Sequence, residues 1–156
     1  MSPYVRRLRA AVGHDMLLLP SVAVLARDHE GRLLLMRSSD SGQWQTVGGA
    51  IDLEETPQDA ARREAFEEAG VEVQLGGIMA VLGGPQYRMT YPNGDETAYV
   101  TTVFEAAVVG GAMAADGKEA SDVAWFAPDD LVDCDMNAFT RALLVDVGLL
   151  RSTPDG

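Results

Sequence analysis

The sequence predicts one α/β domain in which helices cover a mixed β-sheet. Strand-like apolar runs lie both before and after one internal helical segment, and further helical segments lie near the two ends of the chain. The length of 156 residues suits a single domain, and neither a linker nor an internal repeat divides it. We therefore expect a single domain over residues 1–156, with helices on both faces of the sheet.

The first elements follow from local patterns. Val5, Leu8 and Val12 stand at helical spacing between arginines, which predicts a short amphipathic helix over about 3–13 that packs on the domain or on a second subunit. SVAVLA and GRLLLMR, joined by the polar turn RDHEG, predict two strands. The polar segment SSDSGQWQTVGG that follows is expected to be a loop.

The internal helix has clear start and stop signals. Thr56 suits an N-cap, Pro57 the first helical position, and Gly70 the C-terminal glycine, so we expect a helix over about 57–69. Beyond it, VEVQL and GIMAVLG read as strands, and Asn93-Gly94 predicts a hairpin between QYRMTY and TAYVTTVFEAAVV. VAWFA predicts a short strand, NAFTRALLVDVGLL a C-terminal helix, and about 152–156 a disordered tail.

Charge and cysteine content restrict the function classes. The chain has 24 acidic residues against 12 Lys and Arg, a formal net charge of -12, which argues against binding a nucleic-acid duplex. A small nucleotide stays compatible if divalent cations screen the carboxylates. A single cysteine, Cys134, cannot form an internal disulfide, and Pro20 interrupts the N-terminal apolar run, which is too short for a membrane span. We expect a cytoplasmic protein that does not bind membranes.

Three glutamates share one face of the expected internal helix. Glu64, Glu67 and Glu68 fall within an arc of about 100°, because their spacings are three and four residues. Arg63 lies toward one side of this arc rather than between them, so another partner should compensate the like charges. Mg²⁺ takes oxygen ligands and would do so. An acidic, solvated helix face explains the same spacing equally well.

The residues around this face resemble the Nudix hydrolase signature. The match places Gly49, Glu55, Arg63, Glu64, Glu67, Glu68, Gly70 and Val71 in register. The resemblance covers nearly the whole chain and implies a Nudix fold, a mixed sheet sandwiched between helices. Two positions depart from the pattern. Ala65 is smaller than usual, and Val47 stands where many members have proline before the two glycines.

The resemblance also implies a site. Its metal ligands, for Mg²⁺ or Mn²⁺, would be the Gly48 carbonyl and the carboxylates of Glu64, Glu67, Glu68 and Glu119. The resemblance leaves the general base open between Glu64, Glu67 and Glu119, while Asp116, Asp122, Glu105 and Glu96 compete with Glu119 for its place. Arg63, counted with the catalytic group, would brace the loop and helix through Glu55. Gly49 and Gly70 would support the site.

The implied reaction is metal-dependent hydrolysis of the pyrophosphate linkage in a nucleoside diphosphate joined to another group, such as ADP-ribose, a nucleotide sugar or a nucleotide alcohol. One alternative is a MutT-type sanitising enzyme that cleaves normal or oxidised nucleoside triphosphates to the monophosphate and pyrophosphate. Another is a module that senses a nucleotide sugar without cleaving it. Family resemblance also allows a homodimer. The expected substrate contacts are Arg37, Trp44, Tyr87, Arg88 and Phe139, with Tyr91 as a further stacking residue.

Overall fold

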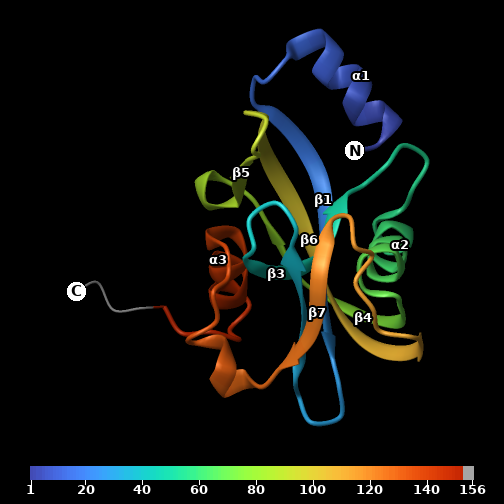
Figure 1. Ribbon diagram of the computed structural model, residues 1–156, viewed down its shortest axis with the longest axis vertical. Coiled ribbons are helices and arrows are strands. Elements are labelled where there is room, and N and C mark those ends of the chain that lie inside the picture. Colours follow the sequence, from blue (N-terminus) through green and yellow to red (C-terminus); the bar gives the residue numbers. More distant parts are fainter. Residues whose placement is uncertain (153–156) are drawn as a thin grey trace.

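A seven-stranded mixed sheet forms the centre of the protein (Figure 1). The computed structural model describes residues 1–152. Residues 153–156 of the expected tail therefore lie outside the described residues. The sheet has the order β4-β6-β1-β3-β2-β7, with β5 paired to β6, and of the strand pairs within residues 1–152 only β1–β6 is parallel. The strands are β1 (Leu17–Arg27), β2 (Leu33–Ser38), β3 (Trp44–Ala50), β4 (Val71–Leu82), β5 (Arg88–Thr90), β6 (Glu96–Gly111) and β7 (Ala120–Phe126).

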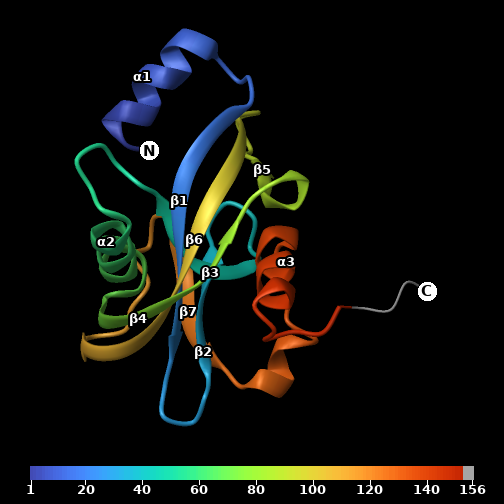
Figure 2. The ribbon, with the colours of Figure 1, turned by 180° about the vertical axis from the view of Figure 1, so that it is seen from behind.

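Helices cover both faces of this sheet. Figures 1 and 2 show α2 on one side of the sheet and α3 on the other, and α1 lies across the end where β1 begins, on the α2 side. This arrangement confirms the predicted α/β class. No helix within residues 1–152 is both long and apolar enough to cross a membrane. The helices are α1 (Pro3–Val12), α2 (Pro57–Ala69) and α3 (Ala138–Asp146), with short 3₁₀ turns η1 (Pro85–Tyr87) and η2 (Pro128–Leu131).

Helix α2 begins and ends where the sequence predicts. The Thr56 hydroxyl accepts a hydrogen bond from the Asp59 N–H, and Gly70 takes a left-handed conformation with φ 71° that ends the helix. The helix packs on the sheet through alanines, whose small side chains allow close approach. The buried alanines are Ala60, Ala61, Ala65 and Ala69. The small residue at position 65 is therefore part of a tight helix-to-sheet contact.

Two local expectations were wrong. The segment expected to be a loop contains strand β3, because Thr46 and Val47 are buried between β1 and β2, which flank the strand on either side. The two strands expected after α2 form one strand, β4, whose pairing with β6 is irregular between Leu75 and Ile78. Phe66 is 59% exposed. Its position on α2 turns away from the sheet that the alanines contact.

The apolar core lies in two halves, one on each face of the sheet. The half under α2 contains Val22, Val24, Val47 and Phe104, and the half under α3 contains residues such as Leu25. Val47 pairs with Val24 in the β3–β1 ladder and is 1% exposed. Valine in place of proline therefore keeps β3 regular as far as the two glycines, because it retains the backbone N–H that proline lacks.

Candidate active site

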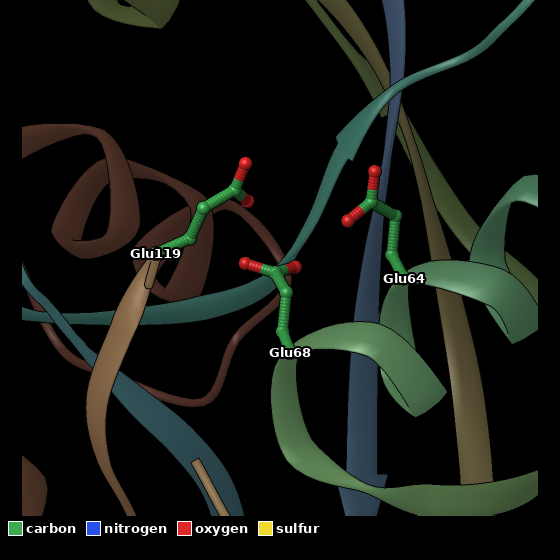
Figure 3. Close-up of side chains that lie close together, drawn as sticks. All are labelled: Glu64, Glu68 and Glu119. Carbon is green, nitrogen blue, oxygen red and sulfur yellow. The ribbon is translucent and has the colours of Figure 1, made fainter. Parts of the chain in front are cut away.

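Three carboxylates converge beside the start of β7. Glu64 and Glu68 come from α2, and Glu119 comes from the loop before β7. Figure 3 shows the three side chains pointing toward one another, and each offers an oxygen within 4.8 Å of the others. Glu64 and Glu68 are buried, whereas Glu119 is exposed. The structure thus brings together three of the sequence-predicted carboxylates from two distant parts of the chain.

Two glycines in β3 make room for these carboxylates. The Gly48 N–H donates a hydrogen bond to Glu68 Oε1 at 2.9 Å. A Cβ added at Gly49 would lie 2.5 Å from Glu64 Oε1, and one added at Gly48 would lie 2.1 Å from the Val22 carbonyl oxygen. Both positions therefore require glycine because of close approach, one to a carboxylate and one to the backbone of β1.

Arg63 links the carboxylates to the loop before α2. Its Nε donates to Glu55 Oε2 at 2.5 Å, and its Nη2 donates to Glu55 Oε1 and to the Ala50 carbonyl. Its Nη1 donates to Glu64 Oε1 at 2.9 Å and to Glu67 Oε2 at 3.2 Å. From the position of Arg63 to one side of the acidic arc we expected only another partner to compensate the like charges, and this was wrong, because its guanidinium contacts both Glu64 and Glu67.

The pKa values of these glutamates shift in different directions, because pairing with Arg63 lowers a pKa and burial raises it. Hydrogen bonds from Arg63 are the main reason that the pKa of Glu55 lies below its usual value. Burial raises the pKa of Glu64. Burial also raises the pKa of Glu68 well above its usual value, and the neighbouring Glu64 carboxylate raises it further. Ionisation of both Glu64 and Glu68 is therefore unfavourable unless a cation lies between the two carboxylates.

The other expected acids lie outside this cluster. The Glu67 side chain is 55% exposed and contacts Arg63, although it borders the same cleft as the cluster. Asp116 accepts hydrogen bonds from the N–H groups of Lys118 and Ala120, so it braces the loop that carries Glu119. Among residues 1–152, the cluster consists of Glu64, Glu68 and Glu119 alone, without Asp122, Glu105 or Glu96.

The cluster opens into a cleft of about 960 Å³. Its walls come from α1, the loop after β2, the hairpin between β5 and β6, and the loop that carries Glu119. A volume near the upper end of the usual range for ligand pockets, about 300–1,000 Å³, suits a nucleotide with an attached group. A smaller recess adjoins the cleft along Gly48, Gly49 and Tyr91.

Polar and aromatic side chains line this recess. The Asn137 side chain caps α3 by accepting the Thr140 N–H at 2.8 Å, and its amide nitrogen donates to Gln45 Oε1 at 3.1 Å. Tyr99 and Phe139 pack edge to face with their ring centroids 6.0 Å apart. Oriented amides beside aromatic rings can both hydrogen-bond and stack with a planar heterocycle.

The expected substrate contacts divide into two groups. Phe139 and Tyr91 line the recess. The others do not lie along the cleft or the recess. Trp44 packs edge to face on Phe126 at the border of the core, Tyr87 is buried and donates to Asp146, Arg37 donates to the Gly42 carbonyl, and Arg88 is exposed on β5. We therefore do not retain these four as substrate contacts.

Sequence reasoning missed several lining residues. Gln45 and Asn137 were not recognised as lining residues. Gln45 stood as a polar residue in an expected loop, and Asn137 is the N-cap of α3, so each has an ordinary structural explanation. Tyr99 was read as part of a strand, although it and Tyr91 flank the predicted hairpin turn, which was the available signal. Arg9 was read only as a charge on an amphipathic helix.

The cluster fits a hard divalent cation. Its donors are all carboxylate oxygens, which Mg²⁺ and Mn²⁺ prefer, and two of them are buried side by side. Gly48, whose carbonyl the sequence predicts as a ligand, lines the same cleft. A cation here would remove the repulsion that raises the pKa of Glu68.

Comparison with known proteins gives the family. A sequence model described as the NUDIX domain matches residues 17–146. A MutT-like protein of Streptomyces ambofaciens is 32% identical over 111 residues, which are 71% of this chain and 65% of that protein, so the chain spans just under two thirds of it. A protein named nucleoside triphosphatase NudI from Klebsiella pneumoniae is 33% identical over 129 residues, which are 78% of this chain and 92% of that protein.

Solved structures share the fold at lower identity. A MutT protein from Methanosarcina mazei aligns with a TM-score of 0.71 at 21% identity, over 86% of this chain and 95% of that one. An ADP-ribose pyrophosphatase from Streptococcus suis aligns with a TM-score of 0.66 at 20% identity, over 88% of this chain and 94% of that one. With the domain match over residues 17–146 and a relative that is 33% identical over 92% of its length, the chain belongs to the Nudix family and is a Nudix pyrophosphohydrolase.

Proposed function

We propose that this enzyme hydrolyses a phosphoanhydride bond of a nucleotide at the cluster formed by Glu64, Glu68 and Glu119. The observation that carries the proposal is the position of this cluster, in a cleft large enough for a nucleotide and next to a recess lined with aromatic rings and amides. In this arrangement the recess takes the base, and the phosphates lie beside the carboxylates.

The residues of the cleft have different roles in the proposed reaction. Glu64, Glu68 and Glu119, together with the Gly48 carbonyl, hold the divalent cation, for which Mg²⁺ is our first choice and Mn²⁺ the second. When bound, the cation supplies positive charge to the phosphate oxygens and acidifies the attacking water. Glu67 borders the cleft without belonging to the cluster, so we propose that it accepts the proton of that water. Arg63 positions Glu64 and Glu67 through its Nη1.

Nucleoside triphosphates are the first substrate class to test. The relatives at 33% identity that are named nucleoside triphosphatase support this choice, ahead of the linked nucleoside diphosphates that the sequence analysis preferred. The linked nucleoside diphosphates remain a second candidate, because the cleft continues from the carboxylates to α1 and leaves room for a further group. A sensing module without catalysis is not pursued, since the chain is an enzyme.

The test is product release from a panel of compounds with Mg²⁺ or Mn²⁺. The panel holds nucleoside triphosphates, ADP-ribose, nucleotide sugars and CDP-alcohols, and we expect metal-dependent turnover that is highest for a triphosphate. Glu67→Gln should fold normally and lose about 100-fold in kcat, because it removes the proton acceptor while keeping the shape. Glu54→Gln, which changes a glutamate of the β3–α2 loop, is the control. Full turnover by Glu67→Gln would refute the assignment of the base.

A further inference from the structure

Helix α1 lines the catalytic cleft although it lies outside the region that defines the family. The domain match begins at residue 17, whereas α1 spans Pro3–Val12. Met1, Ser2, Val5 and Arg9 nevertheless line the same cleft as the carboxylate cluster. Their spacing places Val5 and Arg9 one helical turn apart on a single face. This face of α1 is therefore a wall of the active site.

The Arg9 side chain ties α1 to the rest of the domain. The helix itself has no buried residue, yet the Arg9 side chain is only 9% exposed. Its Nη2 donates to the Glu96 carbonyl at 2.7 Å and to Thr97 Oγ1 at 3.0 Å, both on β6. Its Nη1 donates to the carbonyls of Gly13 and Asp15. Arg9 thus joins the helix, the segment after it and the sheet.

The same network continues into the hairpin between β5 and β6, which forms a neighbouring wall of the cleft. Arg9 Nε lies 3.5 Å from Asp95 Oδ2, and His14 Nδ1 lies 2.7 Å from Asp95 Oδ1. Asp95 also accepts from the Asn93 amide, and its carbonyl accepts from the Tyr91 N–H. Tyr91 lines both the cleft and the recess. A substitution at Arg9 would therefore affect the positions of both α1 and the hairpin between β5 and β6.

We propose that α1 is a substrate-selecting wall of the active site and that Arg9 is the positioning residue that holds it there. This inference rests on the proposed function, because it assigns a role in binding the same nucleotide. The recess is lined by neither α1 nor the carboxylates of α2, so with the base in the recess, α1 faces the phosphates and any group attached to them. Val5 contacts that part of the substrate.

Displacing α1 should weaken binding and leave the chemical step intact. The carboxylates lie on α2 and on the loop before β7, and the hydrogen bonds of Arg9 do not touch them. If Arg9→Ala leaves α1 in place for about one tenth of the time, the apparent affinity falls about tenfold. We therefore expect KM to rise about tenfold with kcat within about twofold of the wild type.

The experiment uses the full chain and two readouts. KM and kcat are measured on the preferred substrate, and binding of a nucleoside triphosphate with a non-hydrolysable α,β-methylene bridge is measured by calorimetry. Arg7→Ala is the matched control, since it removes the same charge from an exposed position on the same helix. Arg9→Lys keeps the charge but lacks the planar fork of donors, so its KM should lie between those of the wild type and Arg9→Ala.

A second pair of variants tests the wall itself without touching Arg9. Val5→Asp places a carboxylate toward the bound phosphates, and Val5→Asn places a neutral side chain of the same size there. We expect Val5→Asp to bind the methylene analogue about threefold or more weakly than Val5→Asn at low salt. The difference should shrink as salt increases, because salt screens exposed charges.

The outcomes separate this inference from the proposed function. Equal KM values for Arg9→Ala and Arg7→Ala, or a fall in kcat at unchanged KM, would overturn the role of α1 even if hydrolysis is confirmed. Binding of the analogue by the wild type without turnover of any nucleotide would overturn the proposed function, while a tenfold weaker binding by Arg9→Ala would still support the wall. A wild type that neither binds nor hydrolyses nucleotides would overturn both.

Discussion

Glu68→Gln should make the metal-free protein more stable while removing its metal affinity. Glu68 is 2% exposed, and its carboxylate lies close to that of Glu64. Burial and this neighbour both raise its pKa, so ionisation works against the folded state. Glutamine has nearly the same shape, and its side-chain oxygen can still accept the Gly48 N–H.

The magnitude follows from the upper bound on the distance between the carboxylates. Two unit charges that lie within 4.8 Å of each other repel with about 3 kcal/mol or more at an effective dielectric constant of 20. The pair relieves part of this energy by retaining a proton, so we expect the free energy of unfolding to rise by about 2 kcal/mol at neutral pH. For a chain of this length, that corresponds to a gain of about 4 to 8 °C in Tm.

The assay is thermal unfolding in chelator and again with Mg²⁺ added. The wild type should gain Tm with Mg²⁺, since a ligand that binds only the folded state stabilises it, whereas Glu68→Gln should gain little. Glu67→Gln is the control, because Glu67 is exposed and paired with Arg63, and its metal-free Tm should not rise. A lower metal-free Tm for Glu68→Gln, or a Mg²⁺ response equal to that of the wild type, would refute the reasoning.

Three further predictions follow from the same site. Gly49→Ala should fold but bind Mg²⁺ more weakly, because its Cβ would press on the Glu64 carboxylate; unchanged metal affinity by calorimetry would contradict this. Gly48→Ala should lower Tm severely or prevent folding, because its Cβ would meet the Val22 carbonyl oxygen, and a normal circular dichroism melt would contradict it. Without metal, the folded state holds the proton of Glu68 more tightly than the unfolded chain does, so unfolding releases a proton between the ordinary pKa of 4.5 and the raised one. The contribution of Glu68 to stability therefore falls as pH rises above the ordinary pKa of 4.5 toward the raised one in chelator, a trend that Glu68→Gln should lose in urea titrations.

Elements with local causes could be predicted from sequence. The bounds of α2 follow from Thr56, Pro57 and Gly70, which act on the backbone within one helical turn. The hairpin follows in the same way from Asn93-Gly94, where Gly94 takes a φ of 91°. The order of glutamates on α2 was also visible, because helical periodicity fixes which side chains share a face.

Features that depend on tertiary contacts could not be predicted. Spacing gave one acidic face, but the packing of alanines on the sheet decides that Glu64 and Glu68 are buried while Glu67 is exposed. Strand β3 was hidden in polar sequence, because its pairing with β1 and β2 rather than its own propensity makes it a strand. Trp44 and Tyr87 looked like stacking residues because an aromatic residue suits a core and a ligand site equally well.

The parallel pairing of β1 with β6 determines when the active site can exist during folding. Ser21 and Thr101, which hydrogen-bond across this pair, are 80 positions apart, so a long loop must close before the centre of the sheet forms. Glu119 directly precedes β7, the edge strand paired with β2, so its position beside Glu64 and Glu68 depends on that pairing. Recovery of cation affinity after dilution from denaturant should thus coincide with the last step of refolding. Cation binding would then report when the complete sheet has formed.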